Sequence, residues 1–217
     1  MAHAGLIESE ADIRAGVRAL RRKCEIMRHV HALAGDPPLR RRPAGFEGLA
    51  RIVVGQQLSV ASAEAIWRRT CEAVAPFEPE ILLASEEAVL RAAGLSRPKV
   101  RTLRSVAEAS SDGRIVWAEL GGAPPEHVHE VLTAVPGIGP WTADIFLMFC
   151  VGHRDAFAPG DLALQAAAQI AGGLETRPKP DELAALAERW RPWRGVAARM
   201  LWAFYKVEKE ARSGLPV

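Results

Sequence analysis

The sequence predicts an all-α fold, a compact helical array folded as two lobes with a cleft between them. Apolar residues recur at helical spacing over most of the 217 residues, whereas the β-branched runs and strict alternation typical of strands are scarce. Apolar residues make up 49% and charged residues 25% of the chain, as in an ordinary globular protein, so neither disorder nor a collagen-like repeat is expected. A chain of this length can bury a sizeable core without disulfides.

The predicted helices follow one another with short breaks. Apolar periodicity places them at 10–34, 46–74, 86–93, 98–110, 125–134, 141–151, 162–171, 181–190 and 193–212. Glycine and proline clusters at 35–38, 121–125, 172–173 and 178–180 separate them. No stretch has the composition of a flexible linker. We therefore expect residues 1–217 to form one unit, with a central lobe at 44–151 and a second lobe formed by 1–43 and 152–217.

Charge and cysteine content narrow the possible function classes. The chain has 28 basic and 26 acidic residues, and the net charge of +2 is too small to indicate nucleic acid by itself. Basic residues do cluster at 18–23, 40–42 and 189–199, where solvated helix faces and a nucleic-acid contact both stay open. The three cysteines, Cys24, Cys71 and Cys150, lie far apart, so we expect neither a disulfide framework nor a cysteine-rich metal site.

The sequence shows no membrane or export signal. No uninterrupted apolar run approaches the roughly 20 residues of a bilayer span. Glu8, Glu10 and Asp12 lie where a secretory peptide has a basic and then an apolar segment. We expect an intracellular, cytoplasmic protein without a membrane partner.

The most informative stretch is 135–144, which reads V-P-G-I-G-P-W-T-A-D between two predicted helices. Its glycines permit a tight bend and the close approach of another molecule. Such a turn leaves the amides of Gly137, Gly139 and the first helical residues, including Thr142, aimed outward beside the positive end of a helix. That arrangement suits a phosphate. The alternative is a helical hairpin that needs glycine for its geometry alone.

This segment resembles the helix-hairpin-helix of the HhH-GPD DNA glycosylase superfamily, with the hairpin at 133–144. The stretch F-A-P-G-D at 157–161, followed by L-A-L-Q, is similar to that superfamily's Gly/Pro-rich loop, which ends in an aspartate. Three further stretches are similar to the bacterial DNA-3-methyladenine glycosylase II branch: V-G-Q-Q-L-S-V-A-S-A at 54–63, G-L-S at 94–96 with Lys99, and Trp190 through P-W-R-G to Trp202. The resemblance implies that the hairpin lies beside the cleft between the lobes.

Asp161 is the residue for which the resemblance changes the interpretation most. At the start of a predicted helix, an aspartate by itself indicates an N-cap. The resemblance implies that Asp161 is the catalytic carboxylate, and the two roles are compatible. Breaking an N-glycosidic bond gives the sugar oxocarbenium character, which a fixed carboxylate stabilises where water is excluded. The same group can orient or deprotonate the attacking water.

The resemblance also implies which chemistry the chain lacks. Trp141 occupies the position at which relatives that also cut the DNA strand carry a nucleophilic lysine. Iron-sulfur relatives carry four cysteines near the C-terminus, whereas no cysteine follows Cys150 in this sequence. A monofunctional glycosylase without an iron-sulfur cluster or a required cofactor is therefore implied. Trp141 and Trp202 are implied to stack on the flipped base, since an indole face attracts a cationic alkylated purine. For Trp202, a place in the apolar core is the alternative.

Two further features follow from base flipping and from the family. A flipped base leaves a gap in the stack, and we expect Gln57 or Leu58 to fill it; an ordinary helix start capped by Ser59 is the alternative. The resemblance implies a Na⁺ or K⁺ ion held by backbone carbonyls of Thr133, Val135 and Ile138.

The histidine pairs 29/31 and 127/129 have members two residues apart, which diverge on a helix, so no zinc site is expected. Asp155 is expected to brace its loop with Arg154.

These features together predict the function. We expect a monomeric, nucleoid-associated enzyme of base-excision repair that flips alkylated purines of the 3-methyladenine type out of double-stranded DNA and hydrolyses their N-glycosidic bonds. Two alternatives stay open. One is a glycosylase of the same fold for deaminated bases such as hypoxanthine or uracil. The other is a non-enzymatic helix-hairpin-helix protein that binds DNA damage.

Overall fold

The computed structural model describes residues 5–213, which form two compact units of helices. One unit comprises the chain up to residue 41 together with the chain from residue 152 onward, and the other comprises residues 42–151. Among residues 5–213 there is no strand, only an isolated antiparallel bridge between Leu6 and His153. The all-α prediction is confirmed. None of the helices in this range is long and apolar enough to span a membrane.

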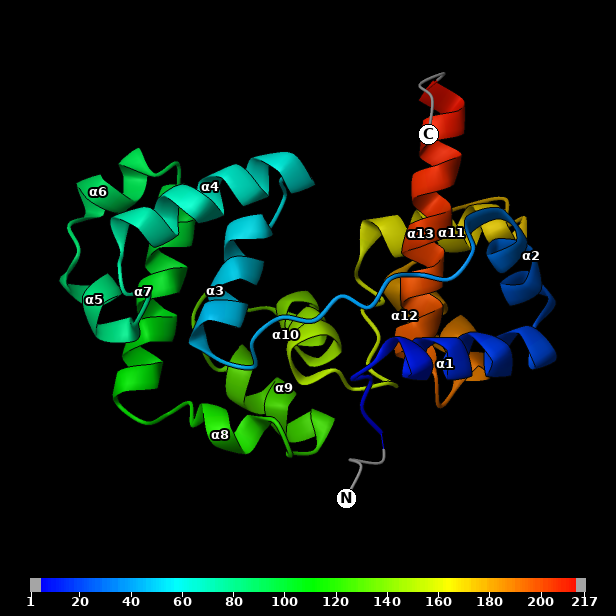
Figure 1. The fold of residues 1–217 in the computed structure, drawn as a ribbon, viewed down its shortest axis with the longest axis horizontal. Helices are drawn as coiled ribbons and strands as arrows, with labels where there is room; N and C mark the ends of the chain where they lie inside the picture. The colour runs from blue at the N-terminus through cyan, green and yellow to red at the C-terminus, as the bar shows by residue number, and fades with distance from the viewer. Residues whose placement is uncertain (1–4, 214–217) are drawn as a thin grey trace. The chain divides into compact units, whose positions relative to one another are not determined.

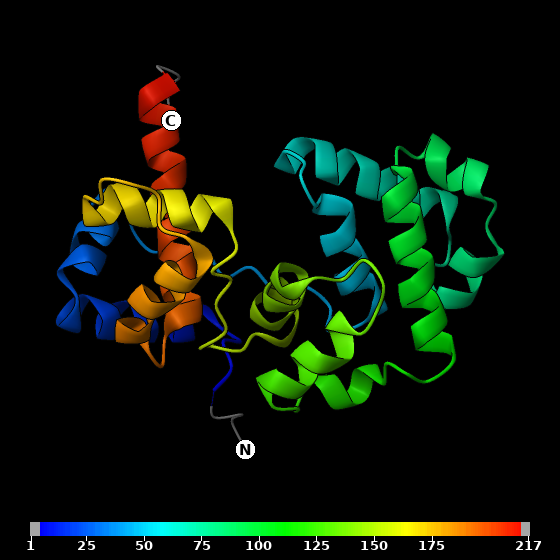
Figure 2. The same cartoon turned by 180° about the vertical axis from the view of Figure 1, so that it is seen from behind.

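The unit formed by the two chain ends is built around its last helix. It contains α1 (Glu10–Lys23), α2 (Glu25–Ala34), α11 (Leu162–Gly172), α12 (Pro180–Ala187), the 3₁₀ turn η2 (Glu188–Trp190) and α13 (Arg194–Ser213). Helix α13 packs against α1, α2 and α11 (Figures 1 and 2) and buries Met200, Leu201 and Phe204 completely. A Cβ atom at Gly16 would lie 2.6 Å from Cγ2 of Val196, so only glycine permits the close approach of α1 to α13.

The unit of residues 42–151 is arranged around α3 and α7. It contains α3 (Phe46–Gly55), α4 (Val60–Ala73), α5 (Pro79–Ala84), α6 (Glu87–Ala92), α7 (Arg97–Ser111), α8 (Trp117–Leu120), α9 (Pro125–Thr133), α10 (Pro140–Phe146) and a π-helical turn, η1 (Leu147–Val151), that continues α10. Helix α7 packs against α3 and α5, and α3 also packs against α4 and α10 (Figure 1). Leu49, Leu103 and Phe146 are completely buried at these contacts.

Two long predicted helices are each two helices in the structure. The predicted helix 10–34 breaks at Cys24, whose backbone is extended at φ −137° and ψ 119°. The predicted helix 46–74 breaks at residues 56–59, between α3 and α4. The sequence prediction also missed α5 and α8, which have six and four residues.

Candidate functional site

Asp161 lies at the start of α11 and caps that helix. Its Oδ1 accepts hydrogen bonds from the backbone amide of Leu164 at 2.9 Å and from the indole Nε1 of Trp202 at 3.0 Å. The side chain is half-buried. The first bond is the N-cap interaction that the sequence predicts for an aspartate here. The second bond ties the carboxylate to α13, so two helices fix its orientation.

The loop that leads into Asp161 is held by contacts with residues of η2 and α11. Phe157 and Ala158 are buried, and the ring of Phe157 lies 5.9 Å from the ring of Trp190. The side-chain amide of Gln165 donates to the carbonyl of Pro159 at 2.9 Å. Gln165 is only 5% exposed, so this bond is shielded from water. Residue type and spacing indicate no role for Gln165, although it lies in the L-A-L-Q stretch after the loop.

Asp155 anchors the beginning of this loop, and its partners differ from the expected one. It forms ion pairs with Arg191 at 2.6 Å and Arg194 at 3.1 Å and accepts the backbone amide of Arg194 at 3.2 Å. Arg154, the expected partner, instead lies over the ring of Trp193 at 5.2 Å. The prediction was wrong because Asp155 is 9% exposed and faces the turn before α13.

The P-W-R-G stretch at 192–195 also binds the beginning of this loop. The amide of Gly195 donates to the carbonyl of Arg154 at 2.8 Å, and a Cβ atom at Gly195 would lie 2.8 Å from that carbonyl oxygen. Arg199, one turn further, is 4% exposed and donates to the carbonyl of Gly195 at 2.8 Å. Burial lowers the pKa of Arg199 to about 10. Much of the basic cluster at 189–199 is therefore structural.

Trp202 does not belong to the completely buried face of α13. Its neighbours Leu201 and Phe204 are fully buried, whereas Trp202 is half-buried and directs its N–H to Asp161. The family resemblance implies that Trp202 stacks on the base, which stays a prediction, and the structure adds the indole–carboxylate hydrogen bond. Trp141 is half-buried in α10, in the unit of residues 42–151, and its stacking role also stays a prediction.

The hairpin between α9 and α10 contains two glycines with different requirements. Gly137 has φ +90°, and a Cβ atom there would lie 2.0 Å from Oγ1 of Thr102, so the fold itself demands glycine. Gly139 has an extended backbone and open space beside its Cα, because a Cβ atom there would have no heavy atom within 4 Å. Within residues 5–213 neither glycine's amide donates a hydrogen bond to the protein. The hairpin thus has outward donors and room beside Gly139 for another molecule.

Thr142 differs from the prediction. It is 2% exposed, and its amide donates to the carbonyl of Gly139 at 3.0 Å instead of facing outward. Its hydroxyl accepts the side-chain amide of Gln56 at 2.9 Å. The predicted phosphate contact through the Thr142 amide is therefore wrong, because the first turn of α10 uses that donor. Thr142 instead joins the hairpin to the loop between α3 and α4.

The loop between α3 and α4 presents exposed side chains. Gln57 is exposed and has φ +57°, and Leu58 and Val60 are 38% and 85% exposed. Ser59 caps α4 by accepting the amide of Ser62 at 3.2 Å. Both interpretations of this stretch are therefore compatible with the structure, since a capped helix start carries apolar side chains that face solvent.

Metal ligands other than carbonyls are scarce. Within the described part of the chain no three or more histidine, cysteine, aspartate or glutamate side chains are grouped so as to hold a metal ion. His129 Nε2 lies 3.0 Å from Oδ1 of Asp144 and connects α9 to α10. Of the three carbonyls expected to bind a cation, that of Val135 accepts the Ile138 amide at 3.0 Å, which leaves it a second lone pair.

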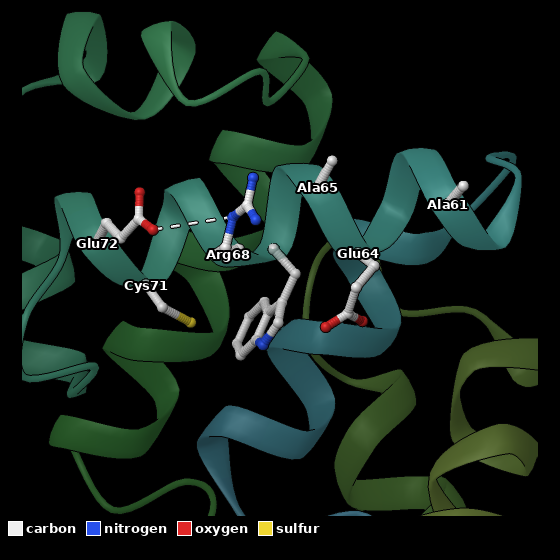
Figure 3. Close-up of a pocket in the computed structure, with 7 residues that line it drawn as sticks. Ala61, Glu64, Ala65, Arg68, Cys71 and Glu72 are labelled. Carbon is white, nitrogen blue, oxygen red and sulfur yellow. Dashed lines mark ion pairs between the residues drawn. The ribbon is translucent and has the colours of Figure 1, made fainter.

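A surface pocket of about 720 Å³ runs along α4 and contains none of the predicted site residues. Figure 3 shows its lining, including the Arg68–Glu72 ion pair. Burial, followed by the nearby Glu47 carboxylate, raises the pKa of the Cys71 thiol in this pocket. Since the thiolate is the reactive form of cysteine, Cys71 is a poor nucleophile. The chemistry is better assigned to Asp161.

Known proteins are similar to this chain in sequence and in fold. The model of a family described as HhH-GPD superfamily base excision DNA repair protein matches residues 50–192. DNA-3-methyladenine glycosylase 1 of Schizosaccharomyces pombe is 31% identical over 75% of this chain and 73% of that protein. A DNA-3-methyladenine glycosidase from Bacillus halodurans, known from its crystal structure, is 34% identical in sequence to this chain. The structural match covers 90% of this chain and 91% of that protein's chain, with a TM-score of 0.77. A S. pombe 3-methyladenine DNA glycosylase in complex with abasic DNA is 28% identical, with a TM-score of 0.80 over 87% of this chain and 95% of its own.

Proposed function

We propose that this chain, which belongs to the HhH-GPD superfamily of base excision DNA repair proteins, is a glycosylase for alkylated purines of the 3-methyladenine type in duplex DNA. The names of its relatives support this substrate class, and one relative was solved with abasic DNA, the product of such a reaction. The observation that carries the assignment of chemistry is the carboxylate of Asp161, fixed by two hydrogen bonds at the end of the Gly/Pro-rich loop.

Asp161 acts on the sugar. As the bond between C1′ and the base nitrogen breaks, its electron pair leaves with the base and positive charge develops on C1′ and the ring oxygen. A carboxylate held in place stabilises that charge without first having to reorganise. Water then adds to C1′ and loses a proton, which Asp161 can accept. The products are the free base and an abasic site.

The substrate lessens the need for a general acid. A purine alkylated at a ring nitrogen is cationic and leaves as a neutral molecule, so one carboxylate is enough. Trp202 supplies an indole beside that carboxylate, and an indole face attracts a desolvated cation by about 2 kcal/mol. We propose that the enzyme does not cleave the strand, because Trp141 replaces the lysine that would form a Schiff base.

The hairpin holds the DNA backbone in this proposal. The amides of Gly137 and Gly139 donate to no protein acceptor among residues 5–213, so they are available to a phosphate oxygen. The exposed Gln57 and Leu58 fill the gap that the flipped base leaves. Carbonyls of Thr133, Val135 and Ile138 form a neutral oxygen set that fits Na⁺ or K⁺, and such an ion would add positive charge near the phosphate. One chain carries all these parts, so we propose that it acts as a monomer.

Base release from damaged DNA tests the proposed function. Randomly methylated duplex DNA is incubated with the protein, and released bases are separated by chromatography. The proposal predicts 3-methyladenine among the products. Defined duplexes containing uracil or hypoxanthine serve as competitors. Excision of uracil or hypoxanthine without any methylated purine would overturn the substrate assignment, and binding of damaged DNA without release of any base would overturn the enzymatic one.

A further inference from the structure

Lys99 on α7 holds the end of α3. Its Nζ donates to the carbonyl of Val54 at 2.7 Å and to the carbonyl of Gln56 at 2.8 Å. The last carbonyls of a helix have no partner within the helix, so a cation is favourable there for both its hydrogen bonds and its charge. Lys99 is half-buried, and desolvation lowers the pKa of its ammonium group. Its position therefore carries a desolvation cost, which the two hydrogen bonds oppose without removing it.

The backbone held by Lys99 leads directly into a strained residue. Gln57 is the one non-glycine residue among residues 5–213 with a left-handed φ, and this conformation costs about 1–2 kcal/mol for an L-residue. The next amide, that of Leu58, donates only over 3.4 Å, to the carbonyl of Gly55. A strained backbone persists where its surroundings determine it. The hydrogen bonds from Lys99 to the carbonyls of Val54 and Gln56 fix the backbone directly before Gln57.

The same part of α7 also contacts the hairpin. Thr102 lies three residues after Lys99, one turn along α7, and fills the space where Gly137 has no side chain. The side chain of Gln56 reaches the hairpin directly through Thr142 at 2.9 Å. Lys99, Gln56 and Thr142 thus form a connection, the α7 brace, between the exposed tip at Gln57–Leu58 and the hairpin.

We infer that Lys99 is a positioning residue for DNA distortion: through the α7 brace it fixes the tip at Gln57–Leu58 relative to the hairpin, so that the tip enters the base stack while the hairpin holds the backbone. This inference rests on the proposed function, in which the tip fills the gap. A tip without the brace would have to be ordered during insertion, and that ordering would cost conformational entropy. Contacts of the hairpin with phosphate would be unaffected.

A fluorescent base measures insertion separately from DNA binding. A duplex carries 2-aminopurine next to an abasic-site analogue, and the fluorescence rises when its stacking is disturbed. Lys99→Met removes the donors but keeps the apolar stem. It should lower the equilibrium for insertion and the single-turnover rate of base release about tenfold, as expected for the loss of a charged hydrogen bond. Affinity for undamaged duplex should change less than about threefold, because the phosphate contacts of the hairpin are kept.

Two further variants isolate the cause. Arg101→Met removes a positive charge from an exposed position of the same helix and should leave insertion near the wild-type value. Thr142→Val keeps the shape of the buried side chain but removes the acceptor for Gln56, and should reduce insertion in the same way as Lys99→Met. Thermal melting confirms that each variant is folded at the assay temperature.

The outcomes separate this inference from the proposed function. If wild-type protein gives no fluorescence rise, the proposed role of the tip is wrong. If wild-type protein inserts and Lys99→Met inserts equally well, the tip role stands and the inference about Lys99 is overturned. Equal losses in Lys99→Met and Arg101→Met would also overturn it, because the effect would then be one of charge alone.

Discussion

Trp202 donates its indole N–H to Oδ1 of Asp161 across 3.0 Å, although the two residues are 41 positions apart in the sequence. The same oxygen accepts the amide of Leu164. The carboxylate is therefore oriented by the middle of one helix and the first turn of another. An aspartate used only as a cap would need the second of these bonds and not the first.

Trp202→Phe tests whether the indole nitrogen matters for catalysis. Phenylalanine keeps an aromatic face but removes the donor, and we expect single-turnover base release to slow about tenfold, since a hydrogen bond to a charged group contributes about 1.5–3 kcal/mol. Trp117→Phe is the matched control, because Trp117 also donates its indole N–H to a side-chain oxygen, that of Ser110, at 3.2 Å. Equal rates for wild type and Trp202→Phe would show that Trp202 serves only as an aromatic surface.

Asp155→Ala tests the anchor of the catalytic loop. Asp155 is 9% exposed and pairs with both Arg191 and Arg194, so its removal takes a buried carboxylate away from two guanidinium groups. We expect a loss of about 3 kcal/mol in the free energy of unfolding. Urea denaturation measures the loss. Asp112→Ala removes the exposed partner of Arg114 and should cost far less, because solvent screens a surface ion pair. Similar costs for the two variants would contradict the anchoring role.

The two hairpin glycines should respond differently to alanine. Gly137→Ala combines a left-handed backbone with a Cβ that would collide with Thr102, so we expect a loss of about 2 kcal/mol or more in unfolding free energy. Gly139→Ala meets no protein atom and should leave stability unchanged. It should weaken binding to duplex DNA, because the new methyl group occupies the space proposed for the backbone. Unchanged DNA affinity in a stable Gly139→Ala protein would argue against a phosphate there.

The first helix provides a pH-dependent contribution to stability. The carboxylate of Asp12 accepts hydrogen bonds from the hydroxyl of Ser9 and from the backbone amides of Glu8 and Ser9. These bonds lower the pKa of Asp12, and the bond from the Ser9 hydroxyl has the largest effect. A lowered pKa in the folded state means that the contribution is complete above the ordinary value of 3.8 and disappears as the pH falls through the lowered value.

Asp12→Asn tests this contribution. We expect it to lower the free energy of unfolding by about 0.3–1 kcal/mol at neutral pH, the usual contribution of a negative charge in the first turn of a surface helix. Stability curves of the two proteins should converge below the pKa of Asp12, where the wild-type carboxyl is also neutral. Chemical denaturation over a series of pH values gives both curves. A constant difference at all pH values would show that the charge of Asp12 is irrelevant.

Local sequence signals predicted the all-α fold well and the helix breaks less well. Proline and glycine identified most boundaries, including those around the hairpin. The break at Cys24 has no such signal, because an extended cysteine interrupts an apolar period that continues from Leu20 to Met27. At the break after Gly55 the last carbonyls of α3 are bound by Lys99, which lies far away in the sequence. Sequence periodicity contains no information about such a contact.

Several residues of the candidate site could be predicted, together with the N-cap bond of Asp161, but the hydrogen bonds between distant residues could not. The hairpin glycines stand out by residue type and spacing, whereas Asp161 is singled out by the resemblance of its loop to that of the family. The partners that orient them, Trp202, Gln165 and Thr102, are ordinary residues on helices, and their roles arise only from packing. Thr142 was misassigned for the same reason, because the fold buries it and uses its amide within α10.

Asp161→Asn tests whether the carboxylate of Asp161 stabilises the sugar cation. Asparagine keeps the size and an oxygen for capping α11 but loses the negative charge. Single-turnover release of 3-methyladenine from a defined duplex should fall by about 10²–10³-fold, the usual cost of removing one stabilising group from a transition state, while affinity for abasic-site DNA persists. Base release at the wild-type rate by the folded variant would contradict the account.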